Sequence, residues 1–289
     1  MDEFGIKING RKISNLRYAD DTALCANNHE EATALINSLN DAGVKKSLKL
    51  NVKKTKTVYI GEDENYSPIK IGEDEIDRVK QFKYLGSIKT EDAYCSTDIR
   101  ARIGMAKQRM TELNNIWRDE NININLKLRL LRCLVWTVMV YGSEGWTLRK
   151  QDETRLESAE MWMYRRLLRV KWQDKRTNDS ILKELNVQRQ ILNEVKKRKM
   201  TYFGHTCRNK KCTLMKECIQ GSLEGLRKRG RPRTSYLENI KAWTNTNKAA
   251  DIYNTVERRQ DWRDEVRKAT RAANAKGQMG NQAAPGDAD

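Results

Sequence analysis

The spacing of apolar residues changes once along this chain, near residue 92, and that change limits the folds it can adopt. Before it, apolar side chains alternate in short runs such as Phe4, Ile6 and Ile8, as is typical of half-buried strands. After it, they recur every three or four residues, which indicates amphipathic helices. We therefore expect an α+β, mostly α-helical chain, with a small mixed part over residues 1–92 followed by helices.

Short extended segments and one helix are expected in the N-terminal part. Asn9-Gly10 is a strong hairpin turn signal after the first strand. Asn28 is a predicted N-cap, and Gly43 is predicted to end the helix that starts there. Between 62 and 77 we expect a loop with one short strand near its end. The extended segments are predicted over residues 13–18, 22–26, 48–52, 57–60, 69–71 and 82–88.

The part after residue 92 is predicted as a series of helices, with a disordered tail over 273–289. Leu126 to Tyr141 is nearly apolar all round, so we expect it to be the buried central helix. Most of the seven tryptophans fall beside apolar faces and are expected in the core. Trp172 lies among basic residues and is the candidate to test for stacking on bases. The helices are predicted over residues 96–113, 126–141, 152–170, 181–185, 188–202, 236–243 and 249–272.

The charge of the chain is concentrated in this helical part. The chain has 56 Lys and Arg against 39 Asp and Glu, a formal net charge of +17. Residues 101–200 carry 22 basic and 12 acidic residues, and residues 201–289 carry 18 and 10. Such a surface attracts polyanions, so nucleic acid is the expected partner rather than a surface tuned only for solubility. Without a long apolar run, a leader-like start or clustered cysteines, we expect an intracellular protein, nuclear or cytoplasmic, with no membrane partner.

Two adjacent carboxylates, Asp20 and Asp21, lie between two predicted strands. Adjacent carboxylates repel each other, so they fit an exposed turn best if a cation binds there. Oxygen ligands of this kind suit Mg²⁺, which uses one or two carboxylates together with substrate phosphates. The alternative is an ordinary acidic turn, and Tyr-x-Asp-Asp alone is a weak signal.

The residues around this pair carry a resemblance that extends over about residues 4–245. The string Asn15 to Leu24, Asn-Leu-Arg-Tyr-Ala-Asp-Asp-Thr-Ala-Leu, resembles the catalytic hairpin of reverse transcriptases, most closely those of non-LTR (LINE-type) retrotransposons. The other segments that look like this family, in the same order, are Gly5 to Gly10, Leu50 to Lys56, Phe82 to Gly86, Ala159 to Leu168, Phe203 to His205 and Gly230 to Arg233.

The resemblance implies a polymerase palm over 1–92, a helical thumb over 93–202 and a basic helical region over 203–272. It implies template-directed nucleotidyl transfer with Mg²⁺, acting on an RNA template, a DNA primer and deoxynucleoside triphosphates. Asp20 and Asp21 would hold the metal, and Tyr18 would line the site near the primer end or incoming nucleotide.

Further site residues follow from the same resemblance. Lys54 or Lys56 would protonate the leaving pyrophosphate or hold its charge, although either could equally be a solvated strand end. Tyr84, Leu85 and Gly86 look like the primer grip, with simple strand-to-loop packing as the alternative.

In the family, a third carboxylate and the fingers lie before the hairpin, whereas Asp20 follows shortly after Met1 here. We therefore expect a truncated polymerase segment with little or no activity alone. The alternatives are a non-catalytic nucleic-acid-binding remnant that uses the basic helices, or a relic with no selected role.

Two further basic runs have binding interpretations. Lys228, Arg229, Arg231 and Arg233 match the core of an AT-hook, and we favour a phosphate-contacting loop over true minor-groove reading. The run from Lys196 to Lys199 could direct nuclear import, but the favoured interpretation is that it forms the solvent-exposed face of a helix.

His205, Cys207, Cys212 and Cys218 raise the question of zinc. Their spacing is not that of a familiar zinc finger, so a packed histidine with free thiols is the expected arrangement.

Overall fold

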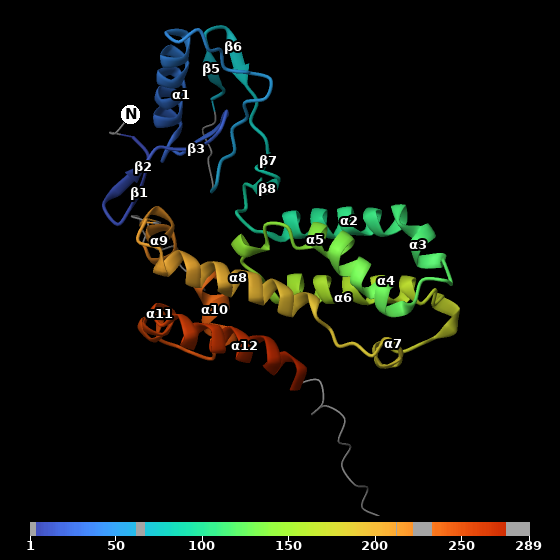
Figure 1. Ribbon diagram of the computed structural model, residues 1–289. Coiled ribbons are helices and arrows are strands. Elements are labelled where there is room, and N and C mark those ends of the chain that lie inside the picture. The colour runs from blue at the N-terminus through green and yellow to red at the C-terminus, as the bar shows by residue number, and fades with distance from the viewer. Residues whose placement is uncertain (1–3, 62–66, 212, 222–232, 276–289) are drawn as a thin grey trace, which may run out of the picture. The chain divides into compact units, whose positions relative to one another are not determined.

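The computed structural model describes residues 4–61, 67–211, 213–221 and 233–275. The chain forms two compact units. The first, here called the strand unit, contains the described residues up to Tyr94 and those from Lys211 to Gly221. The second, the helical unit, contains Cys95–Lys210 and the described residues from Arg233 on. Figure 1 draws the strands in blue to cyan, and the α+β, mostly helical class is confirmed.

The strands of the first unit form four separate antiparallel pairs, and within the described residues no pair joins another to make a larger sheet. Each pair is a hairpin of three or four residues per strand, closed by a two-residue turn. The pairs are β1 (Ile6–Ile8) with β2 (Arg11–Ile13), β3 (Asn15–Tyr18) with β4 (Asp21–Leu24), β5 (Ile69–Ile71) with β6 (Asp74–Ile76), and β7 (Gln81–Tyr84) with β8 (Ser87–Thr90).

The first hairpin forms as its sequence predicts. Asn9 and Gly10 have φ of 49° and 81°, as a turn that matches the strand twist requires. Gly5, just before β1, has φ of 117°, and a Cβ there would lie 2.5 Å from the carbonyl oxygen of Ile13. Glycine is therefore required at position 5 both by the backbone angle and by the close approach of β2.

Helix α1 (His29–Val44) packs against the β5–β6 hairpin and supplies the core of the strand unit. The side chain of Asn28 accepts a hydrogen bond from the backbone N–H of Glu31 at 2.8 Å, so the predicted N-cap is confirmed. The helix continues one residue past Gly43, the predicted end. Its core contains Ile36, Ile69, Ile71 and Ile76.

Three strand predictions need correction. Residues 48–52 are not a strand, because the side chain and carbonyl of Asn51 accept N–H bonds from Lys54 and so hold a turn. Residues 57–60 contribute only one isolated bridge, from Thr57 to Arg78. The single extended piece expected over 82–88 is the β7–β8 hairpin, whose turn places Leu85 at φ of 47°. Leucine rarely adopts that angle, so Gly86, with φ of 81°, is the one residue of this turn that signals it in the sequence.

Helix α9 (Thr213–Gln220), which the sequence analysis did not predict, belongs to the strand unit. Glu217 pairs with Arg11 of β2 at 3.4 Å, and Gly221 lies against Ile8 of β1. A segment after residue 210 is therefore part of the N-terminal unit.

The helical unit begins with α2 (Ser96–Glu112) and α3 (Asn114–Arg118). A continuous helix follows, made of α4 (Ile124–Leu130), a π-helical stretch (Leu131–Trp136) and α5 (Thr137–Met139). A 3₁₀ turn (Ser143–Gly145) leads to the long helix α6 (Lys150–Leu167). After it come a 3₁₀ turn (Trp172–Asp174), α7 (Asn178–Leu185), α8 (Ile191–Arg208), α10 (Tyr236–Thr244), α11 (Ala249–Glu257) and α12 (Arg259–Ala275).

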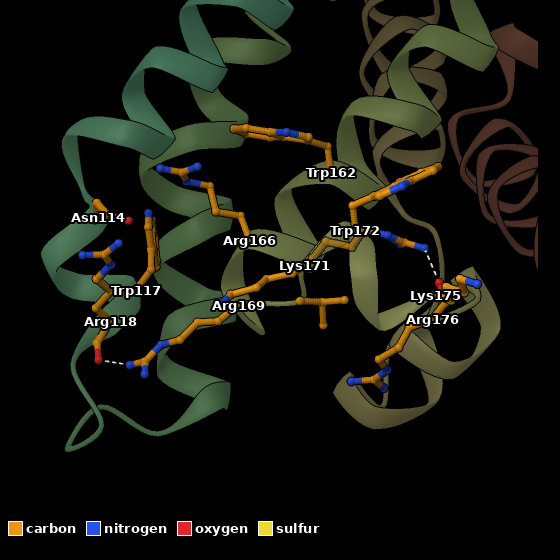
Figure 2. A pocket seen from close by; sticks show the side chains of 12 residues that line it. Asn114, Trp117, Arg118, Trp162, Arg166, Arg169, Lys171, Trp172, Lys175 and Arg176 are labelled. Carbon is orange, nitrogen blue, oxygen red and sulfur yellow. Dashed lines mark hydrogen bonds between the residues drawn. The ribbon is translucent and has the colours of Figure 1, made fainter.

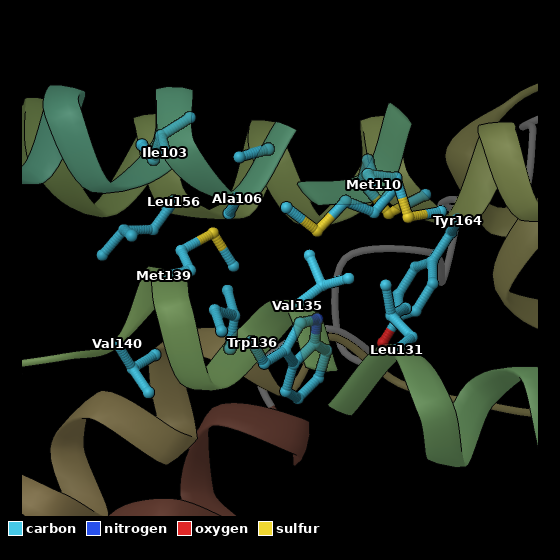
Figure 3. Packing of buried hydrophobic residues seen from close by; sticks show 14 of the residues in the cluster. Ile103, Ala106, Met110, Leu131, Val135, Trp136, Met139, Val140, Leu156 and Tyr164 are labelled. Carbon is cyan, nitrogen blue, oxygen red and sulfur yellow. The ribbon is translucent and has the colours of Figure 1, made fainter. Parts of the chain in front are cut away.

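The predicted central helix is confirmed, and its buried face forms the main core. Leu131, Val135 and Met139 are fully buried and face side chains of α2 and α6 (Figure 3). The outer face is not buried, since Leu126 and Tyr141 are exposed. The core therefore needs only one face of this helix, with α2 and α6 covering it.

Several helix bounds differ from the prediction. The single helix expected over 249–272 is two, α11 and α12, with Arg258 extended between them. The helix expected over 188–202 starts later and runs to Arg208. The sequence suggests Ser96 or Thr97 as the N-cap of the first of these helices, but both lie inside α2, whose N-cap is Cys95. The hydroxyl of Ser96 instead donates to the buried carboxylate of Asp152 on α6 at 2.7 Å. Residues 273–275 of the predicted tail are helical, and the rest of it lies outside the described residues.

The tryptophans follow the prediction. Four are buried, Trp162 and Trp243 pack against the core in part, and Trp172 is 96% exposed. No helix in the part of the chain that the structure describes is both long and apolar enough to cross a membrane.

Candidate functional site

The adjacent aspartates lie at the tip of the β3–β4 hairpin. Tyr18 pairs with Asp21 as the last cross-strand pair, and Ala19 and Asp20 form the two-residue turn between them. Both carboxylates are exposed, and Tyr18 is 66% exposed beside them. Neither aspartate forms an ion pair with any described residue. Two carboxylates without a cationic partner are thus presented to solvent at one hairpin end.

The backbone at this tip is strained. Ala19 has φ of 52°, an angle that costs a non-glycine residue roughly 1–2 kcal/mol. The turn nevertheless keeps alanine directly before the two aspartates. Leu85 in the β7–β8 turn adopts a similar angle, so the backbone angle alone does not mark this tip as functional.

The donor set at the tip fits a hard divalent cation in part. Carboxylate oxygens from Asp20 and Asp21 are ligands that Mg²⁺ accepts, with substrate oxygens completing its shell. Among the described residues, no group of three or more His, Cys, Asp or Glu side chains gathers at this tip or elsewhere. Asp20 and Asp21 could therefore offer two carboxylates to a divalent cation, and no third such side chain gathers with them among the described residues.

The two predicted lysines are placed differently from each other. Lys54 is exposed in the turn that Asn51 caps. Lys56 is mostly buried, and its ammonium pairs with the carboxylate of Asp77 at 2.5 Å. Lys54 is therefore available to a ligand, whereas Lys56 already has a carboxylate partner just after β6.

Tyr84, Leu85 and Gly86 lie at the end of the β7–β8 hairpin, where Leu85 and Gly86 form the turn. The turn reaches solvent, since Leu85 is 42% exposed. This hairpin is a strand pair separate from β3–β4 among the described residues, so sheet pairing does not link the two predicted parts of the site.

The predicted basic loop falls mostly outside the described residues. Lys228, Arg229 and Arg231 lie there, and Arg233 is the exposed residue at which the described chain resumes. The run from Lys196 to Lys199 lies within the described residues, on helix α8. The interpretation that it forms a solvent-exposed helix face is wrong for Lys199, which is completely buried.

The four residues with the zinc-like spacing are only partly described. Cys212 lies outside the described residues. Cys207 and Cys218 form no disulfide within the described part of the chain, and burial followed by the charge of Glu217 raises the pKa of Cys218. His205 is exposed on α8 and not packed, contrary to the expectation. The Phe203–His205 segment contributes to packing. Phe203 is buried, and the lack of a side chain at Gly204 lets the buried indole of Trp262 approach α8.

A buried carboxylate that the sequence analysis missed lies on α6. Glu160 is completely buried, and its Oε1 accepts hydrogen bonds from Tyr164 (2.9 Å) and from the backbone N–H groups of Gln190 (2.8 Å) and Ile191 (3.2 Å). Its Oε2 has no partner among the described residues. Burial raises the pKa of Glu160 to about 7, although these hydrogen bonds act in the opposite direction.

A buried ammonium on α8 was missed as well. The Nζ of Lys199 donates to the carbonyl of Trp146 (2.8 Å) and to the side chain of Asn239 (2.9 Å), and it lies 3.9 Å from the ring centre of Tyr236. Burial lowers the pKa of Lys199 to about 7. A signal existed, because Ile191, Val195, Lys199 and Phe203 recur every four residues on one helix face.

The segment that contains the β3–β4 hairpin is similar to a known protein family. Residues 1–88 match the family described as reverse transcriptase (RNA-dependent DNA polymerase). An uncharacterised transposon-derived protein of Caenorhabditis elegans is 28% identical over 218 residues, which cover 71% of this chain and 75% of that protein. No solved structure matches the chain. The segment that matches the reverse transcriptase family contains all of β1 to β7 and the aspartate tip.

Proposed function

We propose that this chain is the palm and thumb region of a LINE-type reverse transcriptase, and that Asp20 and Asp21 hold the Mg²⁺ of nucleotidyl transfer. The observation that carries the proposal is the exposed pair of carboxylates at a strained hairpin tip, inside the segment that matches reverse transcriptases. The transposon-derived relative and the ordered motifs of the sequence support the retrotransposon origin.

In this proposal the bound metal supplies the positive charge that stabilises the attacking and leaving oxygens. Asp20 and Asp21 hold it through their carboxylate oxygens, and Tyr18 packs beside the nucleotide or the primer end. Lys54, exposed and without an acidic partner among the described residues, donates a proton to the leaving pyrophosphate or holds its charge. Tyr84, Leu85 and Gly86 contact the primer backbone.

Full activity in this proposal needs a third carboxylate, because two acidic side chains bind Mg²⁺ weakly and no third one gathers with them among the described residues. We therefore expect weak or no nucleotide incorporation by this chain unless another segment or chain completes the centre.

Primer extension on an RNA template with a DNA primer, deoxynucleoside triphosphates and Mg²⁺ tests this proposal. The intact chain is compared with the double variant Asp20→Asn/Asp21→Asn and with Asp41→Asn, a control at an exposed aspartate on α1. Extension by the intact chain and the control, lost in the double variant, supports the metal role. Extension that survives in the double variant refutes it.

A second function, nucleic-acid binding without catalysis, is favoured by one observation, the excess of basic residues after residue 100. No extension by any variant, combined with binding of the primer–template that weakens steeply with salt, would support this function instead of polymerisation.

A further inference from the structure

The helical unit contains a hollow lined mainly by basic residues, here called the basic hollow. Its lining residues are far from Asp20 and Asp21 in the sequence. It has a volume of about 1000 Å³ and lies between α3, the end of α6 and the segment that follows α6 (Figure 2). Seven of its twelve lining residues are Arg or Lys, and none is acidic. A concave surface with one sign of charge concentrates its field and favours an anionic ligand.

Most of these cations are not neutralised by carboxylates. Arg169 pairs with Glu120 at 3.1 Å, and Arg176 pairs with Glu184. The other five form no ion pair with any residue in the described part of the chain, and they are Arg118, Arg165, Arg166, Lys171 and Lys175. The hollow therefore keeps a net positive charge that an external polyanion can neutralise.

The arginines at the end of α6 are held in place by neutral partners. Arg165 donates one N–H to the carbonyl of Arg176 at 2.7 Å, while its Nη1 has no acceptor among the described residues. The guanidinium of Arg166 lies 5.6 Å from the ring centre of Trp162. These interactions orient two guanidinium groups without neutralising them, which prepares them to bind phosphate oxygens.

An exposed indole stands at the edge of this hollow. Trp172 is 96% exposed, unlike the other six tryptophans, and Figure 2 shows it beside Lys171 and Lys175. Its backbone is fixed in a 3₁₀ turn, in which the carboxylate of Asp174 accepts the N–H of Lys171 at 2.7 Å. An indole that is almost fully exposed on such a turn offers a platform for a flat ligand.

We propose that this hollow binds single-stranded nucleic acid, with an unpaired base stacked on Trp172 and the adjoining phosphates bound by Arg118, Arg165, Arg166 and Lys175. A planar aromatic surface beside uncompensated cations matches a base and its phosphates. A duplex has its bases already stacked and would contact the cations alone, and an anionic membrane offers phosphates but no flat ring to stack on Trp172. This proposal rests on the second function proposed above, nucleic-acid binding, and assigns it to a particular surface. It does not depend on metal binding by Asp20 and Asp21.

Binding of a fluorescein-labelled oligouridylate, measured by anisotropy, tests the role of the indole. We expect Trp172→Ala to weaken binding about 5- to 100-fold, the range for losing one stacked base, and Trp172→Phe to retain most of the affinity. Because Trp172 is exposed, both variants should unfold at the temperature of the intact chain. Equal affinities of the Trp172→Ala variant and the intact chain overturn the proposal, as does equal affinity of the intact chain for the same strand annealed to its complement.

A pair of charge variants tests the phosphate-binding cations. Arg118→Gln/Lys175→Gln removes two cations of the hollow, and the matched control Arg129→Gln/Lys248→Gln removes two exposed cations outside it. We expect the slope of log affinity against log salt to fall by roughly 0.7 for each phosphate-binding cation that the first variant removes, and to change less in the control. Equal weakening in both variants means that charge acts nonspecifically, which overturns the proposed site while leaving the binding function intact. Binding to anionic vesicles, and none to the oligonucleotide, overturns both.

Discussion

Replacing the buried carboxyl of Glu160 by an amide should change how the stability of the helical unit depends on pH. Burial raises the pKa of Glu160 from its ordinary 4.5 to about 7. Above pH 4.5 the unfolded chain releases this proton while the native chain still holds it. The unfolding free energy of the intact protein therefore falls as pH rises from about 4.5 to about 7, and it changes little from this group beyond that.

The size of the effect follows from the two pKa values. Between about pH 5 and about pH 8 the unfolding free energy of the intact protein should fall by roughly 2–3 kcal/mol, a loss that Glu160→Gln does not show. The amide oxygen of the variant can keep the bonds from Tyr164, Gln190 and Ile191. The amide NH₂ group of the variant occupies the position of Oε2, which has no partner among the described residues. The OH group of the protonated carboxyl occupies the same position in the intact protein. We therefore expect similar stability of the two proteins near pH 5 and a more stable variant near pH 8.

Urea unfolding followed by tryptophan fluorescence is the appropriate assay, because all seven tryptophans lie in the helical unit. Glu157→Gln is the matched control on the same helix, where a partly exposed carboxylate pairs with Arg189 at 3.5 Å, and it should change stability by less than about 1 kcal/mol. Parallel pH profiles for Glu160→Gln and the intact protein would refute the reasoning, because they would mean that burial does not favour the neutral form at this position.

Three further changes probe other parts of the structure. Lys199→Met removes a buried ammonium whose pKa is about 7 instead of 10.5, so the native chain releases this proton at a lower pH than the unfolded chain does. Between about pH 6 and about pH 9 the unfolding free energy of the intact protein should therefore rise by roughly 2–3 kcal/mol relative to the variant, and identical pH profiles in urea unfolding would contradict this. Gly204→Ala puts a Cβ 2.3 Å from the indole nitrogen of buried Trp262, so we expect a loss of roughly 1–3 kcal/mol in thermal unfolding, and an unchanged midpoint would show that α12 can shift freely. Gly5→Ala combines φ of 117° with a Cβ 2.5 Å from the Ile13 carbonyl, so amide protection in β1 and β2 should fall by at least about tenfold in hydrogen exchange, whereas preserved protection would mean that the strained turn tolerates a side chain.

Local sequence signals determined much of the fold. Asn9-Gly10 fixed the first hairpin because both positions need positive φ, and Asn28 marked the start of α1 because its side chain caps a free N–H. The apolar spacing after residue 92 predicted α2, the central helix and α6. The motif around Asp20 and Asp21 indicated a hairpin tip, and the structure places both residues there.

Other elements depended on interactions between distant segments. Helix α9 joins the strand unit through Arg11 and Glu217, which are far apart in sequence, so no local pattern assigned it there. Leu85 forms a hairpin turn although leucine disfavours its angle, because the pairing of β7 with β8 outweighs that local cost.

The ionisable and aromatic groups divide in the same way. The sequence by itself determined that the helical part is basic and that Trp172 lies among cations. Only the tertiary structure decided that Trp172 is exposed beside a hollow without carboxylates, and that Glu160 is buried, whereas the spacing of Lys199 with apolar residues on one helix face already indicated its burial. The physical reason is that charge and periodicity are properties of a segment, whereas desolvation depends on which other segments cover it.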